Sequence, residues 1–206
     1  MRILLVVEDP LLDQHIAKPI VERLVGLAHG QHEVRIMQDP RFRGDTDALD
    51  RERISEVLAK WSWRTDVFVL LVDRDCNRCG VTEARIIARQ EEAQRAGFAL
   101  IGQCAIQELE VWLLAAFQDQ LGVSWKDVRA ECDPKERFFD GLVEQLGIGS
   151  TGPSRGRKEL MQSAIGKLKT IRSRCKEVDH LGRRLVRFLE EKTLDTSVHD
   201  YSTEGR

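Results

Sequence analysis

The stretch VFVLLVDRD, residues 67–75, places two aspartates directly after an unbroken apolar run. A run this apolar is typical of a strand buried on both faces of a parallel sheet. The stretch ILLVV at residues 3–7 has the same character and is followed by Glu8 and Asp9. In open α/β sheets, ligands bind just beyond the carboxyl ends of such strands. If the two strands are neighbours, we expect acids from both to converge on one point.

The first half of the chain alternates predicted strands with predicted helices. Pro19 either kinks the first helix or marks its true start, and Thr82 is a candidate N-cap for the third. Repeats of this kind predict a parallel sheet with right-handed crossovers. The residue pattern predicts strands at 2–7, 33–37, 66–72 and 98–101, and helices near 13–28, 49–61, 82–97 and 106–117.

We therefore predict an α/β fold with a mostly parallel, Rossmann-like four-stranded sheet flanked by helices and followed by a helical C-terminal extension. The predicted boundary places the α/β domain at residues 1–118 and the extension at 119–206, with the two packed as one unit. The 206 residues are 42% hydrophobic and 32% charged, which supports a packed core and does not favour disorder.

Positive charge is concentrated late in the chain. Residues 155–187 contain eleven Lys and Arg against three acids, a net charge of +8, which leaves −10 for the rest of a chain whose total is −2. Such asymmetry suggests a polyanionic partner. A helical surface that contacts only solvent would show the same distribution of charge. The candidate phosphate contacts are Arg155, Arg157, Lys158, Lys167 and Arg172.

The sequence predicts a cytoplasmic protein without a membrane partner. Met1 leads straight into a strand, with no signal peptide, and no apolar run approaches the roughly 20 residues that span a bilayer. Five cysteines without a scaffold pattern indicate a reducing compartment. Cys76 and Cys79 form a CxxC, but Cys104 and Cys132 lie too far off in sequence to complete a zinc site, so a metal or redox role is not favoured.

The strand-end acids predict a divalent-cation site. Asp73 and Asp75 are two residues apart, so in an extended chain their side chains would point the same way and could share one ion. Converging carboxylates are costly unless a cation neutralises them. Hard oxygen ligands without a nearby histidine favour Mg²⁺ or Mn²⁺ over zinc. The alternatives are an Asx-turn at the aspartates and a helix cap or solvated turn at Glu8.

A third acid is expected at the same place. In the predicted helix at 106–117, Glu110 falls within an apolar stripe, whereas Glu108 falls on its polar edge. A carboxylate on a buried face must be paired, hydrogen-bonded, metal-linked or protonated. Glu110 therefore either forms a buried ion pair with an arginine or faces the site formed by the strand-end acids.

Two phosphotransfer families resemble parts of this pattern. LLVVED at residues 4–9 is similar to the opening of a response-regulator receiver domain, but the gap to Asp73 is longer than in receivers and no lysine ends a late strand. Residues 69–77 resemble the DxD motif of haloacid-dehalogenase phosphatases. That motif normally closes the first strand of its fold and continues with Thr or Val, where Cys76 and Asn77 stand here.

A third resemblance covers roughly residues 2–170. Glu8, the DxD at 73–75 and the helix QELEVWLLA at 107–115 resemble the toprim-like proteins of prokaryotic phage defence, including RloB-like and other abortive-infection families. The resemblance implies a toprim-like domain that cleaves nucleic-acid phosphodiesters with Mg²⁺ or Mn²⁺. Such proteins usually carry a glycine and a second glutamate after Glu8; here Asp9 or Asp13 would have to substitute.

The resemblance also implies roles for the candidate residues. Glu8, Asp73 and Asp75 would hold the metal, or Glu8 would act as general acid or base, and Glu110 would support the site. The segment at 155–187 would grip nucleic acid, and an ATPase or another defence protein and a second copy of the chain are the implied partners. The competing class is a binding subunit of a defence system that keeps the fold and has weakened chemistry.

Overall fold

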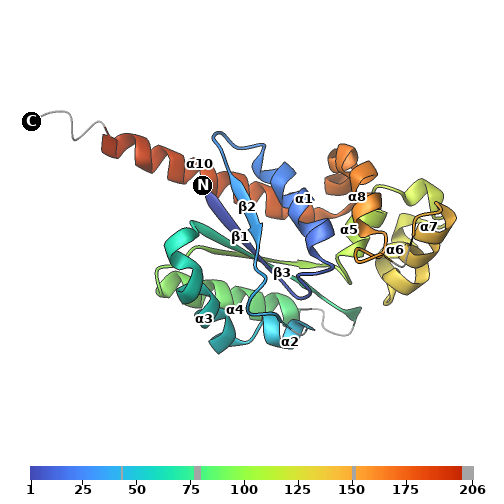
Figure 1. The fold of residues 1–206 in the computed structure, drawn as a ribbon, viewed down its shortest axis with the longest axis horizontal. Coiled ribbons are helices and arrows are strands. Elements are labelled where there is room, and N and C mark those ends of the chain that lie inside the picture. Colours follow the sequence, from blue (N-terminus) through green and yellow to red (C-terminus); the bar gives the residue numbers. More distant parts are fainter. Residues whose placement is uncertain (43, 77–79, 150–151, 201–206) are drawn as a thin grey trace, which may run out of the picture.

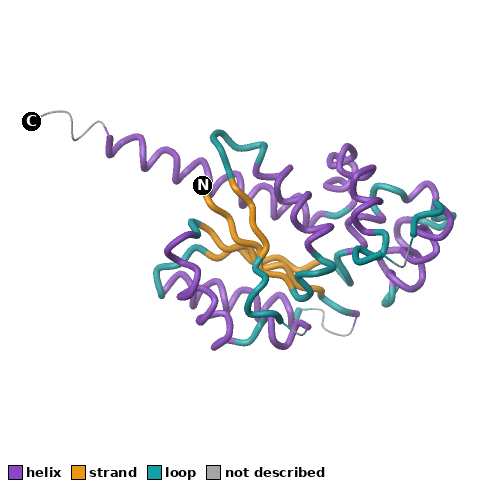
Figure 2. The backbone as a smooth tube through the Cα atoms, in the orientation of Figure 1, coloured by secondary structure: helices purple, strands orange, loops and turns teal. Residues whose placement is uncertain are grey.

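A computed structural model describes residues 1–42, 44–76, 80–149 and 152–200, with side chains as far as residue 194. The chain is built around one sheet of four parallel strands, as predicted (Figure 1, Figure 2). The two central strands coincide with the apolar runs at residues 3–7 and 67–72. The strands, in the order in which they lie, are β2 (Glu33–Ile36), β1 (Arg2–Val7), β3 (Val67–Asp73) and β4 (Leu100–Ala105).

The register of the two central strands decides where the acids lie. Val7 of β1 is paired with Leu71 of β3, so the two strands end almost level at the carboxyl edge of the sheet. The strand order changes direction between β1 and β3, because β2 lies on one side of β1 and β3 lies on the other. This switch point is where ligands bind in open α/β folds.

Helices cover both faces of the sheet (Figure 1). One face carries α1 (Gln14–Val25) and α10 (Lys176–Asp200), and the other carries α3 (Arg51–Trp61) and α4 (Val81–Arg95). The remaining helices are α2 (Gly44–Ala48), α5 (Glu110–Leu114), α6 (Trp125–Ala130), α7 (Asp140–Gln145), α8 (Arg157–Ala164) and α9 (Leu168–Arg174), with short helical turns at Ser62–Arg64, Gln118–Gln120, Lys135–Phe139 and Ile165–Lys167.

Alternating strand residues supply two apolar cores. Leu5 and Val69 face one core and Leu4 and Phe68 face the other, and all four are at most 5% exposed. The first core continues without a break from the sheet through α5 and α8 into α10. The C-terminal extension is therefore packed against the α/β domain.

A buried ion pair reinforces this packing. Glu177 at the start of α10 is 5% exposed and accepts hydrogen bonds from Arg129 Nη1 at 2.7 Å and from Trp112 Nε1 at 3.2 Å. These three residues come from α10, α6 and α5. A carboxylate buried this deeply must be paired, and its partners fix the extension against the helix that follows β4.

Three local predictions were wrong. Thr82 is not an N-cap: Gly80 occupies that position, and its N–H donates to Glu83 Oε2 at 2.7 Å. The fourth strand begins at Leu100 rather than at residue 98, because α4 and its closing turn extend that far. The predicted helix at 106–117 is α-helical only from Glu110 to Leu114, since β4 continues to Ala105 and Gln107 has a left-handed φ of 68°.

Candidate functional site

A cavity of about 630 Å³ opens at the carboxyl edge of β1 and β3. Carboxylates and cations gather in its lining, together with Leu12, Phe42 and Gly44. The charged residues come from both parts of the chain, since Lys135 and Arg157 belong to the helical extension. The acids that line the cavity are Glu8, Asp9, Asp13, Asp73, Glu108 and Glu110, and the cations are Arg41, Lys135 and Arg157.

Glu8 and Asp73 are joined directly. The backbone N–H of Asp73 donates to Glu8 Oε1 at 2.7 Å, and Asp73 Oδ1 accepts the N–H of Leu109 at 2.9 Å. The carboxylates thereby connect the ends of β1 and β3 to the start of α5. The prediction that acids from both strands converge is confirmed, and its cause is the pairing of β1 with β3.

Burial and mutual repulsion raise the pKa values of several of these acids, which favours their protonated, uncharged form. Burial, with repulsion from Asp13 among the smaller causes, raises the pKa of Glu8 to about 8. The pKa of Asp73 is raised well above its ordinary value by burial first and then by Asp13 and Glu8. Burial and repulsion from Glu110 raise the pKa of Glu108 to about 7. Such a cluster keeps its protons near neutral pH unless a cation offsets the repulsion.

Asp13 belongs to this cluster. Its Oδ2 accepts the N–H of Asp9 at 2.8 Å, and burial, with repulsion from Glu110 and Asp9, raises its pKa to about 7. The sequence raised Asp13 only as a substitute for a missing glutamate. The turn after β1 brings it to the cavity, because the backbone N–H of Asp13 donates to the carbonyl of Asp9 at 2.8 Å.

Glu110 forms a buried ion pair with Arg157. Its carboxylate accepts a hydrogen bond from Arg157 Nη2, and the two side chains are 6% and 3% exposed. The prediction that Glu110 is buried is confirmed, and the structure combines the two alternatives considered: Glu110 is paired with an arginine and also lines the cavity with the strand-end acids. Arg157 also lies 5.2 Å from the ring of Phe139. Arg157 is thus buried and already paired, and its predicted contact with phosphate stays a prediction.

Asp75 lies apart from the other predicted ligands. It is exposed and is not among the residues that line the cavity. β3 ends at Asp73, and Asp75 has a left-handed φ of 55°, so the chain is not extended here as we had assumed. The expected parallel orientation of Asp73 and Asp75 is wrong for this reason, and a role of Asp75 as a metal ligand stays a prediction.

The other predicted nucleic-acid contacts divide into two groups. Lys167 donates to the carbonyl of Ala116 at 3.0 Å, and Arg172 pairs with Asp179 at 2.7 Å, so both already have partners within the chain. Arg155 and Lys158 are exposed. Arg41 and Lys135, neither of which is among the predicted phosphate contacts, line the acid cavity as well. Lys135 follows Asp133 and Pro134, residues typical of a helix start, and a short helix does begin there.

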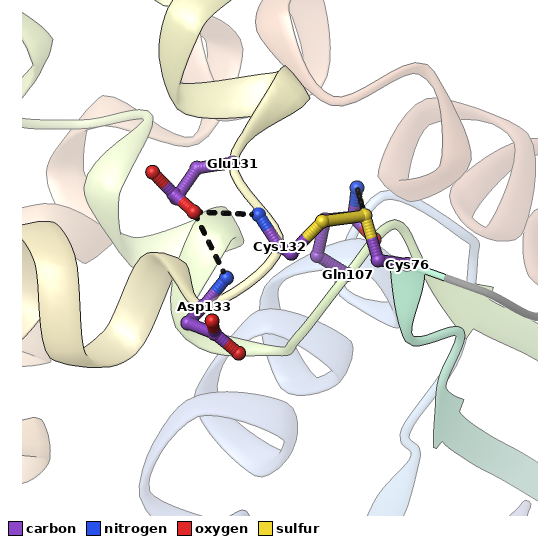
Figure 3. Close-up of a disulfide and its surroundings, with 5 residues drawn as sticks. All are labelled: Cys76, Gln107, Glu131, Cys132 and Asp133. Atoms are coloured by element: carbon purple, nitrogen blue, oxygen red, sulfur yellow. Dashed lines mark hydrogen bonds between the residues drawn. A yellow bond between two sulfur atoms is a disulfide. The ribbon is translucent and has the colours of Figure 1, made fainter.

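Two cysteines close to the cavity form a disulfide. Cys76 is bonded to Cys132, 56 residues further along the chain (Figure 3). This bond runs against the prediction that the cysteines stay reduced, which among the described cysteines holds only for Cys104 and Cys175, both free and buried. Cys79, the second cysteine of the CxxC, lies outside the described residues.

The acids fit a hard divalent cation in their chemistry. They offer carboxylate oxygens, which Mg²⁺ and Mn²⁺ prefer, and their raised pKas reflect a repulsion that a cation would relieve. Over the part of the chain that the structure describes, no three His, Cys, Asp or Glu side chains are already arranged to hold a metal ion. Binding an ion would thus require these side chains to move closer together.

No family model, no curated protein and no solved structure matches this chain. None of the described helices has both the length and the apolar composition needed to cross a membrane. The geometry of the cavity is therefore what bears on function.

Proposed function

We propose that this chain is a metal-dependent nuclease that acts on nucleic-acid phosphodiesters. The observation that carries the proposal is the acid cavity at the switch point between β1 and β3, where Glu8 and Asp73 meet and cations share the lining. Glu8 and Asp73 would hold Mg²⁺ or Mn²⁺, with Asp13 close by. The ion would stabilise the negative charge that develops on a phosphodiester during attack.

The residues of the chain would supply the other roles. With a pKa raised to about 8, Glu8 carries its proton for most of the time at neutral pH, which suits a general acid, or a general base once the proton has left, when no cation occupies its place. Arg41 and Lys135 line the same cavity and would contact phosphate oxygens. Arg155 and Lys158 would extend the contact to the nucleic-acid backbone, because both are exposed on the extension.

The wider setting is part of the same proposal. A toprim-like defence nuclease would act in the cytoplasm, with an ATPase as a partner and with a second copy of the chain as a further one. The resemblance of Glu8, the DxD at 73–75 and the helix around Glu110 to that class supports this setting.

A second candidate is a nucleic-acid- or protein-binding subunit with weakened chemistry. Two observations favour it. The Glu110 carboxylate is already paired with Arg157, and Asp75 is exposed and lies outside the cavity lining. The turn Glu8-Asp9-Pro10 also departs from the pattern of the family that the chain resembles. In this case the chain would bind a partner without cleaving it.

Cleavage of DNA and RNA by the purified protein separates the two candidates. We expect cleavage with Mg²⁺ or Mn²⁺ and none with a chelator, and a loss of about 100-fold or more in Asp73→Asn and Glu8→Gln. Both substitutions keep an oxygen that can accept the observed backbone hydrogen bond. Asp75→Asn is the matched control, because it removes the same charge two residues away at an exposed position.

Each result of the cleavage experiment has a defined interpretation. Absence of cleavage on every substrate, together with absence of any metal-dependent thermal shift, would exclude the nuclease and support the binding subunit. Cleavage that survives both Asp73→Asn and Glu8→Gln would place the chemistry elsewhere. Equal losses in Asp73→Asn and Asp75→Asn would show that the DxD acts as a unit and that the chain rearranges around Asp75 when it binds a metal.

A further inference from the structure

The disulfide joins two segments that both contribute to the cavity. Cys76 follows Asp73 by three residues, and Cys132 precedes Lys135 by three residues. Asp73 belongs to the sheet and Lys135 to the helical extension, and both line the cavity. The bond thus crosses from the acidic strand end to the part of the chain that supplies a cation (Figure 3).

The segment around Cys132 otherwise makes mostly local hydrogen bonds. Glu131 Oε1 accepts the N–H of Cys132 at 2.8 Å and that of Asp133 at 3.3 Å, which closes the turn on itself (Figure 3). A contact with the α/β domain follows at Lys135, whose N–H donates to Glu108 Oε2 at 3.1 Å. This hydrogen bond is weak compared with a covalent link. The other anchor of the segment lies at its far end, where Phe139 is buried in the core.

The segment around Cys76 is held in an unusual conformation. The carbonyl of Gln107 accepts the N–H groups of Arg74 and Asp75 at 3.0 and 3.2 Å, and Gln107 Nε2 lies 3.8 Å from Cys76 Sγ. Asp75 and Gln107 both have left-handed φ values, 55° and 68°. A non-glycine residue pays roughly 1 kcal/mol for this conformation, which persists only where the surroundings impose it. Opening the disulfide would remove one such constraint.

The two bonded cysteines are also the reachable ones. Cys132 is exposed and Cys76 is half-buried, so a reductant can approach the bond. Cys104 and Cys175 are buried, 4% and 0% exposed, and burial raises the pKa of Cys104 to about 12. Because exchange proceeds by attack of a thiolate on a disulfide sulfur, a reductant from solution can reach the Cys76–Cys132 bond, whereas buried Cys104 is a poor attacking group.

We propose that the Cys76–Cys132 bond is a reversible thiol–disulfide switch that fixes the Lys135 segment beside the acid cavity when oxidised and releases it when reduced. The reductant is a dithiol: one of its thiolates attacks a sulfur of the bond and forms a mixed disulfide, and its second thiol resolves that intermediate. Two electrons and two protons pass to Cys76 and Cys132, and the dithiol leaves as its own disulfide. This proposal is independent of the nuclease proposal, because it concerns the mobility of the cavity wall.

Hydrogen exchange of the full-length protein in the oxidised and the reduced state tests the proposal. Digestion without reductant should yield a peptide pair linked through Cys76 and Cys132. Reduction should raise amide exchange in residues 131–137 by about tenfold or more while the strands of the sheet keep their protection. Cys132→Ser should show the reduced pattern under both conditions, whereas Cys104→Ala should keep the full response.

Each alternative outcome overturns the switch. A linked peptide pair with the same exchange in both states would mean that the bond constrains nothing. Loss of protection throughout the sheet on reduction would mean that the bond is a structural staple. A different cysteine pair, detected by mass in the wild type and abolished by Cys79→Ser, would move the chemistry away from Cys132.

Discussion

The buried carboxylate of Glu110 is paired with the guanidinium of Arg157, which lies 47 residues further along the chain. Both side chains line the acid cavity, so the pair forms part of the wall where the α/β domain meets the helical extension. Arg157 compensates one acid of the cluster, whereas Glu8, Asp13 and Glu108 keep raised pKas. The pair consequently neutralises one side of the cavity, and the remaining acids share the lining with Arg41 and Lys135.

Removing one partner of this pair should destabilise the protein strongly. Arg157→Met leaves the Glu110 carboxylate buried without a counter-charge, which we expect to cost about 3–5 kcal/mol in the free energy of unfolding. The double variant Glu110→Gln with Arg157→Met should recover a large part of that loss, since no uncompensated charge is left. Denaturant unfolding at pH 7 measures the free energy of unfolding of the single variants and of the double variant. Simple addition of the two single effects would show that the residues are not coupled.

The metal-free protein should lose stability as the pH rises from about 5 to about 8.5. The pKa of Glu8 is raised from 4.5 to about 8, that of Asp13 from 3.8 to about 7 and that of Glu108 from 4.5 to about 7. The folded state therefore binds more protons than the unfolded state in this window. Stability from such groups is complete below their unfolded pKa values and is lost as the pH passes their folded ones. We expect the melting temperature to fall by roughly 5 °C or more.

The control for this pH dependence is Glu8→Gln. It removes the acid with the highest pKa of the three and also weakens the repulsion that its neighbours feel. The slope of melting temperature against pH should become shallower in this variant. A melting temperature that rises between pH 5 and pH 8 in the wild type would contradict the raised pKas.

A divalent cation should stabilise the protein more at pH 8 than at pH 5.5. Protons and the cation compete for the same carboxylates, so binding strengthens as the acids ionise. Thermal shift with millimolar MgCl₂ or MnCl₂, compared with NaCl at equal ionic strength, measures the effect. Asp73→Asn should abolish most of the shift and Asp75→Asn should keep it. An equal shift at both pH values would indicate a cation bound elsewhere on the surface.

Gly102 should not tolerate a side chain. A Cβ at this position of β4 would lie 2.3 Å from Ile86 Cγ2, which is buried on α4. Gly102→Ala must therefore push α4 away from the sheet, and we expect a loss of about 1–3 kcal/mol. Gly141→Ala in α7 is the matched control, because a Cβ there meets nothing within 4 Å and should stabilise the helix by about 0.5 kcal/mol. Equal effects of the two substitutions would contradict the close packing of α4.

The sheet and its acidic edge could be predicted because their signals are local. Apolar runs ending in Glu8 and in Asp73 are visible within a few residues, and parallel pairing then brings the ends together. The isolation of Glu110 on an apolar helix face likewise identified a buried acid correctly. These features depend on local periodicity, which the sequence carries directly, and on β1 and β3 being neighbours, which was a condition of the prediction and which the structure meets.

The features that the sequence did not reveal depend on distant partners or on a single backbone angle. The partner of Glu110 lies beyond several loops, and the partner of Cys76 is 56 residues away, so no spacing rule connects them. Asp75 was misplaced because one left-handed residue ends the extended chain just after β3. Arg41 enters the cavity lining from a loop with no periodicity to read.

The network around Glu177 has a consequence for how this chain can evolve. Glu177 lies in the extension, yet one of its partners is Trp112 of the α/β domain, and the cavity itself takes Lys135 and Arg157 from the extension. Recombination that exchanged residues 119–206 for the C-terminal part of another protein would leave the indole N–H of Trp112 without its acceptor and would remove two cations from the acid cavity. The two parts are therefore expected to be inherited together, as one unit of selection.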